Sequence, residues 1–207
     1  MEGLDPKRKM RVCGDHFIEE LRNILNTRER QAINCPAYVR AAVVVPLFNK
    51  EESCHILFTR RTEEVKHHKG QISFPGGAFD EEDGDLRKTA LRETFEEIGL
   101  KEKDVRIIGT LDDIVTSTKF VVTPFVGYFG YPYPFRLSQR EIDELIEVPL
   151  SFLFDPECFS EREHVEGELR EVVFTYQYGK HAIWGATARI LKQFLALIPT
   201  ETHVNTL

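Results

Sequence analysis

Three glutamates follow one another at helical spacing near the middle of the chain. Glu93, Glu96 and Glu97 lie within two turns of an expected helix, and at 3.6 residues per turn they fall within roughly 100° of one another. Clustered carboxylates repel, so a partly buried group needs a compensating cation. Oxygen ligands without Cys or His suit Mg2+ or Mn2+, which proteins commonly bind together with substrate phosphates. The apolar residues of this helix are expected on the opposite, core-facing side: Leu91, Phe95 and Ile98.

Two neighbouring features favour a site over a solvated helix face lined with glutamate, which is the ordinary role of such charge clusters. Arg92 lies beside Glu93 and one turn before Glu96, where its charge can orient a carboxylate or lower its pKa. Before the helix, Phe74 to Gly77 form a turn whose glycines permit close backbone approach, and the carbonyl of Gly77 can add a metal ligand.

A locally basic segment precedes the glycine turn in a chain of net charge −7. Anionic groups of a substrate are its expected partners, although a solvated loop is the alternative reading. The segment contains Arg60, Arg61, Lys66, His67, His68 and Lys69.

Residues 76–100 resemble the Nudix box, a glycine and an acid six residues later followed by Arg-Glu-x-x-Glu-Glu-x-Gly and an apolar residue. The matching residues are Gly77, Arg92, Glu93, Glu96, Glu97, Gly99 and Leu100. The general pattern has Glu and seven residues before the Arg, whereas this chain has Asp83 and eight.

Residues 57–77 resemble the motif that precedes the box in coenzyme A pyrophosphatases, where the longer, Asp-containing box also occurs. The matching residues are Thr59, Arg61, His68, Gly70, Ser73, Phe74, Pro75, Gly76 and Gly77.

The two resemblances imply a fold, a site and a reaction. The fold is an α/β class Nudix sandwich, with a mixed sheet between layers of helices. Mg2+ or Mn2+ is expected at Glu93, Glu96, Glu97 and the Gly77 carbonyl, with Arg92 among the catalytic residues. The expected reaction cleaves coenzyme A or its thioesters to 3′,5′-ADP and 4′-phosphopantetheine. Substrate phosphates are expected at Arg60, Arg61, Lys66 and His68.

Two alternatives stay open. The metal-binding residues do not distinguish leaving groups, so the substrate can be another nucleoside diphosphate derivative such as NADH, ADP-ribose or a nucleotide sugar. From a different class, the protein can be a nucleotide-binding regulator without turnover, against which the complete acid cluster argues.

An acid outside the box often supplies a further ligand or the general base in Nudix enzymes. Residues 138–148 predict an amphipathic helix, with Ser138 and Glu141 as a capping box. Glu141 or Glu144 is a candidate for this role, and an ordinary solvated helix face is the alternative.

The remaining pattern predicts one catalytic fold at residues 37–198, an N-terminal extension at 1–36 and a tail at 199–207. The extension contains a predicted helix at 15–28, and a further helix is expected at 186–197. Strands are expected at 38–48, 55–60, 105–115, 120–129, 171–178 and 181–184. Trp184 is expected in the core rather than as a base-stacking surface.

The composition of the chain limits the classes of partner that it is expected to bind. The acidic balance argues against broad binding to nucleic acid or anionic membranes, and no apolar run approaches the roughly 20 residues that span a bilayer. The four cysteines include no C-x-x-C pair, so reduced thiols and a cytoplasmic location are expected. A small nucleotide is the expected partner, and the sequence is also compatible with a homodimer.

Overall fold

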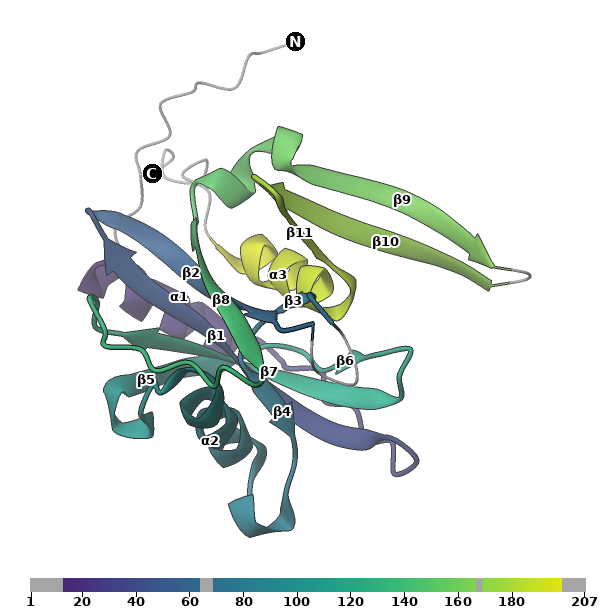
Figure 1. The fold of residues 1–207 in the computed structure, drawn as a ribbon, viewed down its shortest axis with the longest axis horizontal. Helices are drawn as coiled ribbons and strands as arrows, with labels where there is room; N and C mark the ends of the chain where they lie inside the picture. Colours follow the sequence, from purple (N-terminus) through teal and green to yellow (C-terminus); the bar gives the residue numbers. More distant parts are fainter. Residues whose placement is uncertain (1–12, 64–68, 167–168, 199–207) are drawn as a thin grey trace.

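The computed structural model describes residues 13–63, 69–166 and 169–198 (Figure 1). Its main sheet is mixed, because β1 pairs with β7 in parallel whereas its other pairs are antiparallel. The strand order is β3-β2-β1-β7-β5, with β4 beside β1, β6 beside β7 and β8 beside β2. The strands are β1 (Val39–Lys50), β2 (Ser53–Arg61), β3 (Ile72–Ser73), β4 (Gly76–Ala78), β5 (Val105–Thr110), β6 (Ile114–Val115), β7 (Phe120–Phe129) and β8 (Ile142–Pro149).

Helices cover both faces of this sheet. Helix α2 (Leu86–Ile98) packs on one face, where Ala90, Leu91 and Ile98 belong to a buried hydrophobic cluster. Helices α1 (Asp15–Thr27) and α3 (Gly185–Leu197) contribute to a second cluster on the opposite face. The predicted α/β/α sandwich with a mixed sheet is therefore confirmed.

Strand β1 is apolar on both sides because it runs through the middle of the sandwich. Successive side chains of a strand point to opposite faces. Accordingly, Ala42 and Val44 join the cluster beneath α2, while Ala41 and Val45 join the cluster beneath α1 and α3. The β-branched run that predicted this strand thus reflects burial on two faces rather than one.

A second, three-stranded sheet follows β8 in the described part of the chain. It contains β9 (Phe159–Glu166), β10 (Leu169–Tyr178) and β11 (His181–Trp184) in antiparallel pairing. Figure 1 shows the β9–β10 hairpin extending away from the main sheet. Short 3-10 turns complete the path at η1 (Glu81–Asp83), η2 (Glu102–Asp104), η3 (Phe152–Phe154) and η4 (Pro156–Cys158).

The predicted helix at 138–148 is wrong, because this segment forms strand β8. Ile142, Ile146 and Val148 are buried, and β8 pairs with β2 over Ile142–Pro149. Acids lie between these apolar residues at spacings that suit a helix as well as a strand. Pairing with a strand about ninety residues earlier decides between the two, and a local pattern does not contain that information.

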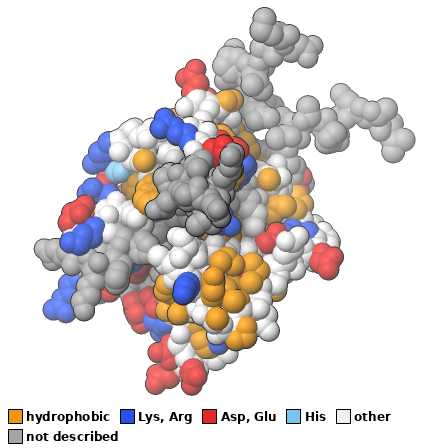
Figure 2. Space-filling view, turned by 90° about the vertical axis from the view of Figure 1, so that its right-hand side faces the viewer, with side chains coloured by type: hydrophobic (Ala, Val, Ile, Leu, Met, Phe, Trp, Pro, Cys, Tyr) orange, Lys and Arg blue, Asp and Glu red, His pale blue; other side chains and the backbone are white. Residues whose placement is uncertain are grey.

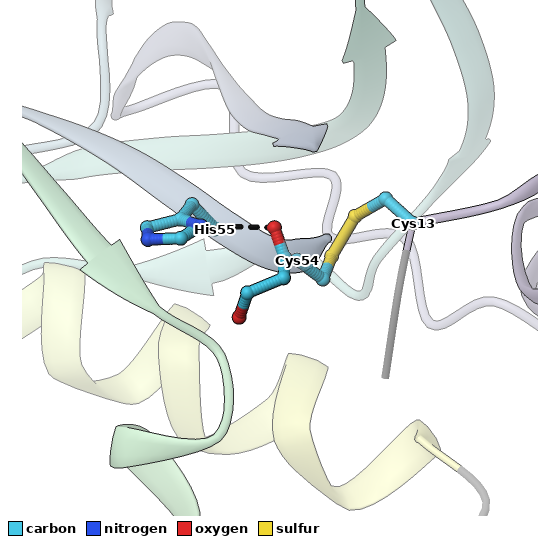
Figure 3. Close-up of a disulfide and its surroundings, with 4 residues drawn as sticks. Cys13, Cys54 and His55 are labelled. Atoms are coloured by element: carbon cyan, nitrogen blue, oxygen red, sulfur yellow. Dashed lines mark hydrogen bonds between the residues drawn. A yellow bond between two sulfur atoms is a disulfide. The ribbon is translucent and has the colours of Figure 1, made fainter. Parts of the chain in front are cut away.

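The expectation of four reduced thiols is also wrong. Cys13 and Cys54 form a disulfide that joins the start of α1 to β2, across 41 residues of sequence (Figure 3). Next to it, His55 Nδ1 donates a hydrogen bond to the Ser53 carbonyl at 3.0 Å. Cys35 and Cys158 are free. The two bridged cysteines meet only because α1 docks on the sheet, so their spacing along the chain did not predict the pairing.

Helix α1 shares the hydrophobic core of the sheet through Phe17, Ile18, Leu21 and Leu25. Ion pairs hold the segment after it: Arg28 contacts Asp112 at 2.7 Å and Arg30 contacts Asp113 at 2.5 Å. The sequence boundary between residues 36 and 37 stays a prediction. Residues 1–12 and the predicted tail lie outside the described residues. In the part of the chain that the structure describes, no helix has the length and apolar character needed to cross a membrane.

We expect the docking of α1 to depend on the absence of a side chain at Gly109. A Cβ there would lie 2.4 Å from Leu25 Cβ, a contact between two backbone-proximal atoms that cannot be relieved by rotating a side chain. Gly109→Ala should lower the free energy of unfolding by about 1–3 kcal/mol, as measured by urea denaturation. Gly130→Ala is the matched control, because nothing lies within 4 Å of a Cβ at that position. Equal stabilities of the two variants would contradict this packing.

Candidate active site

Gly76 and Gly77, expected in a turn, instead lie in strand β4, directly against the acid helix. Strand β4 pairs antiparallel with β1, and Gly76 has a φ of 149° with its hypothetical Cβ only 2.3 Å from the Ala42 carbonyl oxygen. A Cβ at Gly77 would lie 2.5 Å from the carboxyl carbon of Glu93. Gly76 therefore requires glycine, whereas a side chain at Gly77 would displace the Glu93 carboxylate, which now lies against the backbone of β4.

Glu97 is the most deeply buried acid of this helix, with 2% of its surface exposed. Its Oε2 accepts a hydrogen bond from the Gly76 N–H at 3.3 Å, and its Oε1 lies 3.4 Å from Arg61 Nη1. Burial raises the pKa of Glu97 to about 8, although the Arg61 charge and the Gly76 amide oppose this shift. Glu97 is thus a buried carboxyl group whose ionised form is only partly compensated by the protein.

The predicted orientation of the helix is wrong at Phe95, which is half exposed although it was expected in the core. Packing of α2 on β1 and β4 places a different stripe inward. A buried acid on the inward side becomes acceptable only because Arg61 and the Gly76 amide, both outside the helix, contact it. The buried residues are Thr89, Ala90, Leu91, Thr94, Glu97 and Ile98.

Arg92 contacts two carboxylates of the cluster, Glu93 and Glu96, and also the buried carboxylate of Asp83. Its Nη1 contacts Glu93 at 2.9 Å and Glu96 at 3.2 Å. Its Nε donates to Asp83 at 2.7 Å, and Asp83 also accepts from the Thr89 hydroxyl at 2.7 Å. The hydrogen bond from Arg92 is the main reason that the pKa of Asp83 lies well below its usual range.

Asp83 was not among the predicted site residues. The structure gives the acid that departs from the general Nudix pattern a definite place, buried in η1 and bonded to Arg92. Its position after a glycine turn and before an Arg-Glu pair was the available signal, but the sequence does not show that the intervening loop folds back onto the helix.

Glu141 faces the acid cluster, whereas Glu144 does not. The segment that carries Glu141 is tied to the site, because Ser138 N–H donates to the Glu97 carbonyl and Thr62 N–H to the Glu141 carbonyl, at 2.8 and 2.9 Å. Burial raises the pKa of Glu93, and the negative charge of Glu141 adds to the rise at both Glu93 and Glu97.

Glu144 instead lies in a separate charged group, with Arg60 Nε at 3.2 Å and His181 Nε2 at 3.4 Å. Arg60 also forms an ion pair with Asp143. The structure therefore brings Arg61 to the acid cluster and places Arg60 among other acids. Lys66 and His68 lie outside the described residues.

The residues at this site fit a hard divalent cation. Glu93 and Glu97 are oxygen donors with raised pKa, and Gly77 leaves room for the Glu93 carboxylate against the backbone. Among the described residues, no three acidic, His or Cys side chains already converge as a closed metal site. Arg92 contacts Glu93 Oε1 and Glu96 Oε2, and Arg61 contacts Glu97 Oε1, so each carboxylate keeps one oxygen without an arginine contact.

The buried carboxyl of Glu97 predicts a pH-dependent stability of the metal-free protein. A raised pKa in the folded state means that the fold binds this proton more tightly than the unfolded chain does. The resulting stability is complete below the ordinary pKa of 4.5 and is lost as the pH rises through about 8. Gln resembles the protonated acid, so Glu97→Gln should remove this part of the pH dependence.

Urea denaturation in EDTA across this pH range measures the effect. The stability of Glu97→Gln relative to the unsubstituted protein should increase with pH. Glu96→Gln is the control, since it changes an exposed carboxylate of the same helix. Parallel pH profiles for Glu97→Gln and the unsubstituted protein would refute the assignment of a buried, poorly compensated acid.

Comparison with known proteins identifies the family of this chain. Residues 37–177 match the family model described as the NUDIX domain. The chain is 34% identical over 158 residues to a protein of Pectobacterium atrosepticum named uncharacterized Nudix hydrolase NudL, a match that covers 74% of this chain and 80% of that protein. A Salmonella typhimurium protein of the same name is 30% identical over 183 residues, covering 88% and 93% of the two chains.

Solved structures support the fold. A MutT/nudix family protein from Enterococcus faecalis superposes with a TM-score of 0.54 over 89% of this chain and 71% of that chain, at 15% identity. Strand β4, whose glycines lie against the carboxylates of α2, is therefore found in a chain that matches this family in both sequence and fold. The chain belongs to the Nudix hydrolase family.

Proposed function

We propose that the protein hydrolyses the diphosphate of coenzyme A or its thioesters, giving 3′,5′-ADP and 4′-phosphopantetheine or its acyl derivative. One observation carries the proposal. The segment that resembles the coenzyme A pyrophosphatase motif supplies both protein contacts to the buried acid, Arg61 and the Gly76 amide. The two segments that carry the resemblances are therefore in contact at Glu97.

Within this proposal, Glu93, Glu96 and Glu97 hold Mg2+ or Mn2+ together with the Gly77 carbonyl. When bound, such an ion neutralises charge on the phosphoryl oxygens and lowers the pKa of an attacking water. Arg92 acts on the carboxylates rather than on the substrate, because it contacts two of them and is itself held by Asp83. It thereby limits how far Glu93 and Glu96 can rotate.

Glu141 is the better placed of the two outside acids to accept the proton of the attacking water. It is exposed, it acts electrostatically on Glu93 and Glu97, and it forms no ion pair with the described residues. Glu144 has cationic partners on another side of the sheet. Glu93 is the alternative base within the cluster, although its contact with Arg92 and its expected role as a ligand make it less available.

The basic segment is proposed to bind the remaining phosphates. Arg61 is already at the acid cluster, and binding a phosphate there would also leave Glu97 free for a cation. Arg60 would have to exchange Asp143 and Glu144 for a substrate oxygen. Lys66 and His68 belong to the same proposed group on the basis of the sequence alone.

A product analysis tests the proposed reaction. The purified protein would be incubated with Mg2+ or Mn2+ and with coenzyme A, acetyl-coenzyme A, dephospho-coenzyme A, NADH and ADP-ribose, and the products identified by mass. We expect 3′,5′-ADP to form preferentially from the coenzyme A compounds. Glu97→Gln is the control for contaminating hydrolases, since it should lower turnover by orders of magnitude.

The alternatives give different results in the same assay. Preference for NADH, ADP-ribose or a nucleotide sugar would replace the substrate and keep the site. Nucleotide binding without metal-dependent turnover of any of these compounds would favour a regulator and contradict the enzymatic proposal.

The two outside acids provide a matched pair for the general base. Removing a positioned base typically costs about 10²–10⁴-fold in rate, so Glu141→Gln should lower kcat by that order. Glu144→Gln should leave kcat within a few-fold of normal, because its partners are Arg60, Lys180 and His181. Initial rates at saturating metal would measure both. Equal losses, or a larger loss for Glu144→Gln, would exclude this assignment.

A further inference from the structure

Trp184 is the single tryptophan of the chain, and 47% of it is exposed. The expectation that it lies in the core is therefore wrong. We infer that its indole ring is the surface on which the base of the nucleotide substrate stacks. This inference rests on the proposed function, because it concerns the same site and substrate.

The alternation of β11 explains why the indole is exposed. Ile183 is fully buried in the cluster beneath α3, and the next side chain of a strand points to the opposite face. Gly185 then has a φ of 65°, and nothing lies within 4 Å of a Cβ built there. Within the described ranges, no aromatic ring stacks on Trp184. Nearly half of the Trp184 surface is therefore accessible to a ligand.

Hydrogen bonds place the β11–α3 junction beside the segment that contacts the acids. Thr187 Oγ1 donates to the Ile72 carbonyl at 3.1 Å. The residue before it, Gln71, accepts from Arg61 N–H at 3.0 Å, and Ile72 itself lies opposite Arg60 in the β2–β3 pair. Figure 1 shows the start of α3 next to β3, in agreement with these contacts.

The same segment ends at the acid cluster. Four residue steps separate Ile72 from Gly76, whose amide holds Glu97, so the two points are at most about 14 Å apart. The junction that carries Trp184 and the carboxylates that would bind the metal thus lie toward the two ends of one short stretch of chain. A nucleotide has the same arrangement, with its phosphates at one end and a flat aromatic base at the other.

Trp184 is distinguished by its location rather than by its exposure alone. Single exposed hydrophobic residues are ordinary, and hydrophobic side chains also gather on the face shown in Figure 2. Trp184 differs from Val172, which is exposed on a neighbouring strand, because it offers a large rigid π-surface at the β11–α3 junction, next to β3. Stacking on such a ring tolerates any base and needs no hydrogen-bonding partner.

Fluorescence of the unsubstituted protein gives a direct test, because every change in tryptophan emission comes from residue 184. Titration with 3′,5′-ADP should change the emission intensity and saturate, whereas 4′-phosphopantetheine, which has a phosphate but no base, should change it little. Saturable binding of 3′,5′-ADP by calorimetry with unchanged emission would overturn the inference.

Variants separate stacking from an indirect change in emission. Trp184→Ala should weaken 3′,5′-ADP binding by about 5- to 150-fold, and Trp184→Phe should recover most of the loss because it keeps a ring. In turnover, Trp184→Ala should raise KM with little change in kcat, since the base lies away from the reacting phosphorus. Val172→Ala is the matched control for loss of an exposed hydrophobic side chain, and circular dichroism checks the fold of each variant.

The result also distinguishes this inference from the proposed function. Normal binding and KM in Trp184→Ala, in a protein that hydrolyses coenzyme A, would overturn the role of Trp184 and leave the proposed reaction intact. Absence of turnover for every nucleoside diphosphate compound would instead refute the proposed function, with which the stacking role would also fall.

Discussion

The contact on which this structure depends is the burial of Glu97 against the amide of Gly76 and the guanidinium of Arg61. An ionised carboxylate removed from water is costly unless it is paired and hydrogen-bonded. Both protein contacts are long, at 3.3 and 3.4 Å, and burial raises the pKa of the acid to about 8. The protein therefore holds a carboxyl group in a place where a cation would stabilise its charged form.

The sandwich makes this contact possible by bringing three separate stretches of chain together. Strand β1, at the centre of the sheet, pairs with β4 and so fixes the glycines. Strand β2, which pairs with a later part of β1, delivers Arg61. Helix α2 packs over these strands and presents Glu97 to them, while Asp83 and Arg92 hold the neighbouring acids. The position of one carboxylate thus depends on the sheet, on the turn and on the helix.

Local periodicity predicted the elements whose pattern is unambiguous. The β1–β2 hairpin, β7, α1, α2 and α3 all appear near their expected bounds, because each has a continuous apolar stripe or a β-branched run. Strand β8 was missed because its identity depends on pairing with β2. The Cys13–Cys54 disulfide depends in the same way on the docking of α1, which spacing along the chain does not reveal.

At the site, too, local spacing predicted some features, whereas others depend on tertiary contacts. Spacing alone grouped Glu93, Glu96 and Glu97, but it could not tell which of them is buried. Burial of each acid depends on how α2 is rotated about its axis relative to β4. In the observed rotation Glu97 is buried and Phe95 is half exposed. Nor could it separate Glu141 from Glu144, since both were expected on one helix whereas β8 and the turn before it send them to different surroundings. Asp83 acquires its role only when η1 folds back onto Arg92.

The buried acids and the glycine backbone are proposed to form a cation site. Anomalous diffraction from crystals grown with Mn2+ tests it most directly, because the signal locates the ion without reference to any assumed chemistry. We expect a peak between Glu93, Glu97 and the Gly77 carbonyl. A peak elsewhere, or no peak at all, would contradict this assignment.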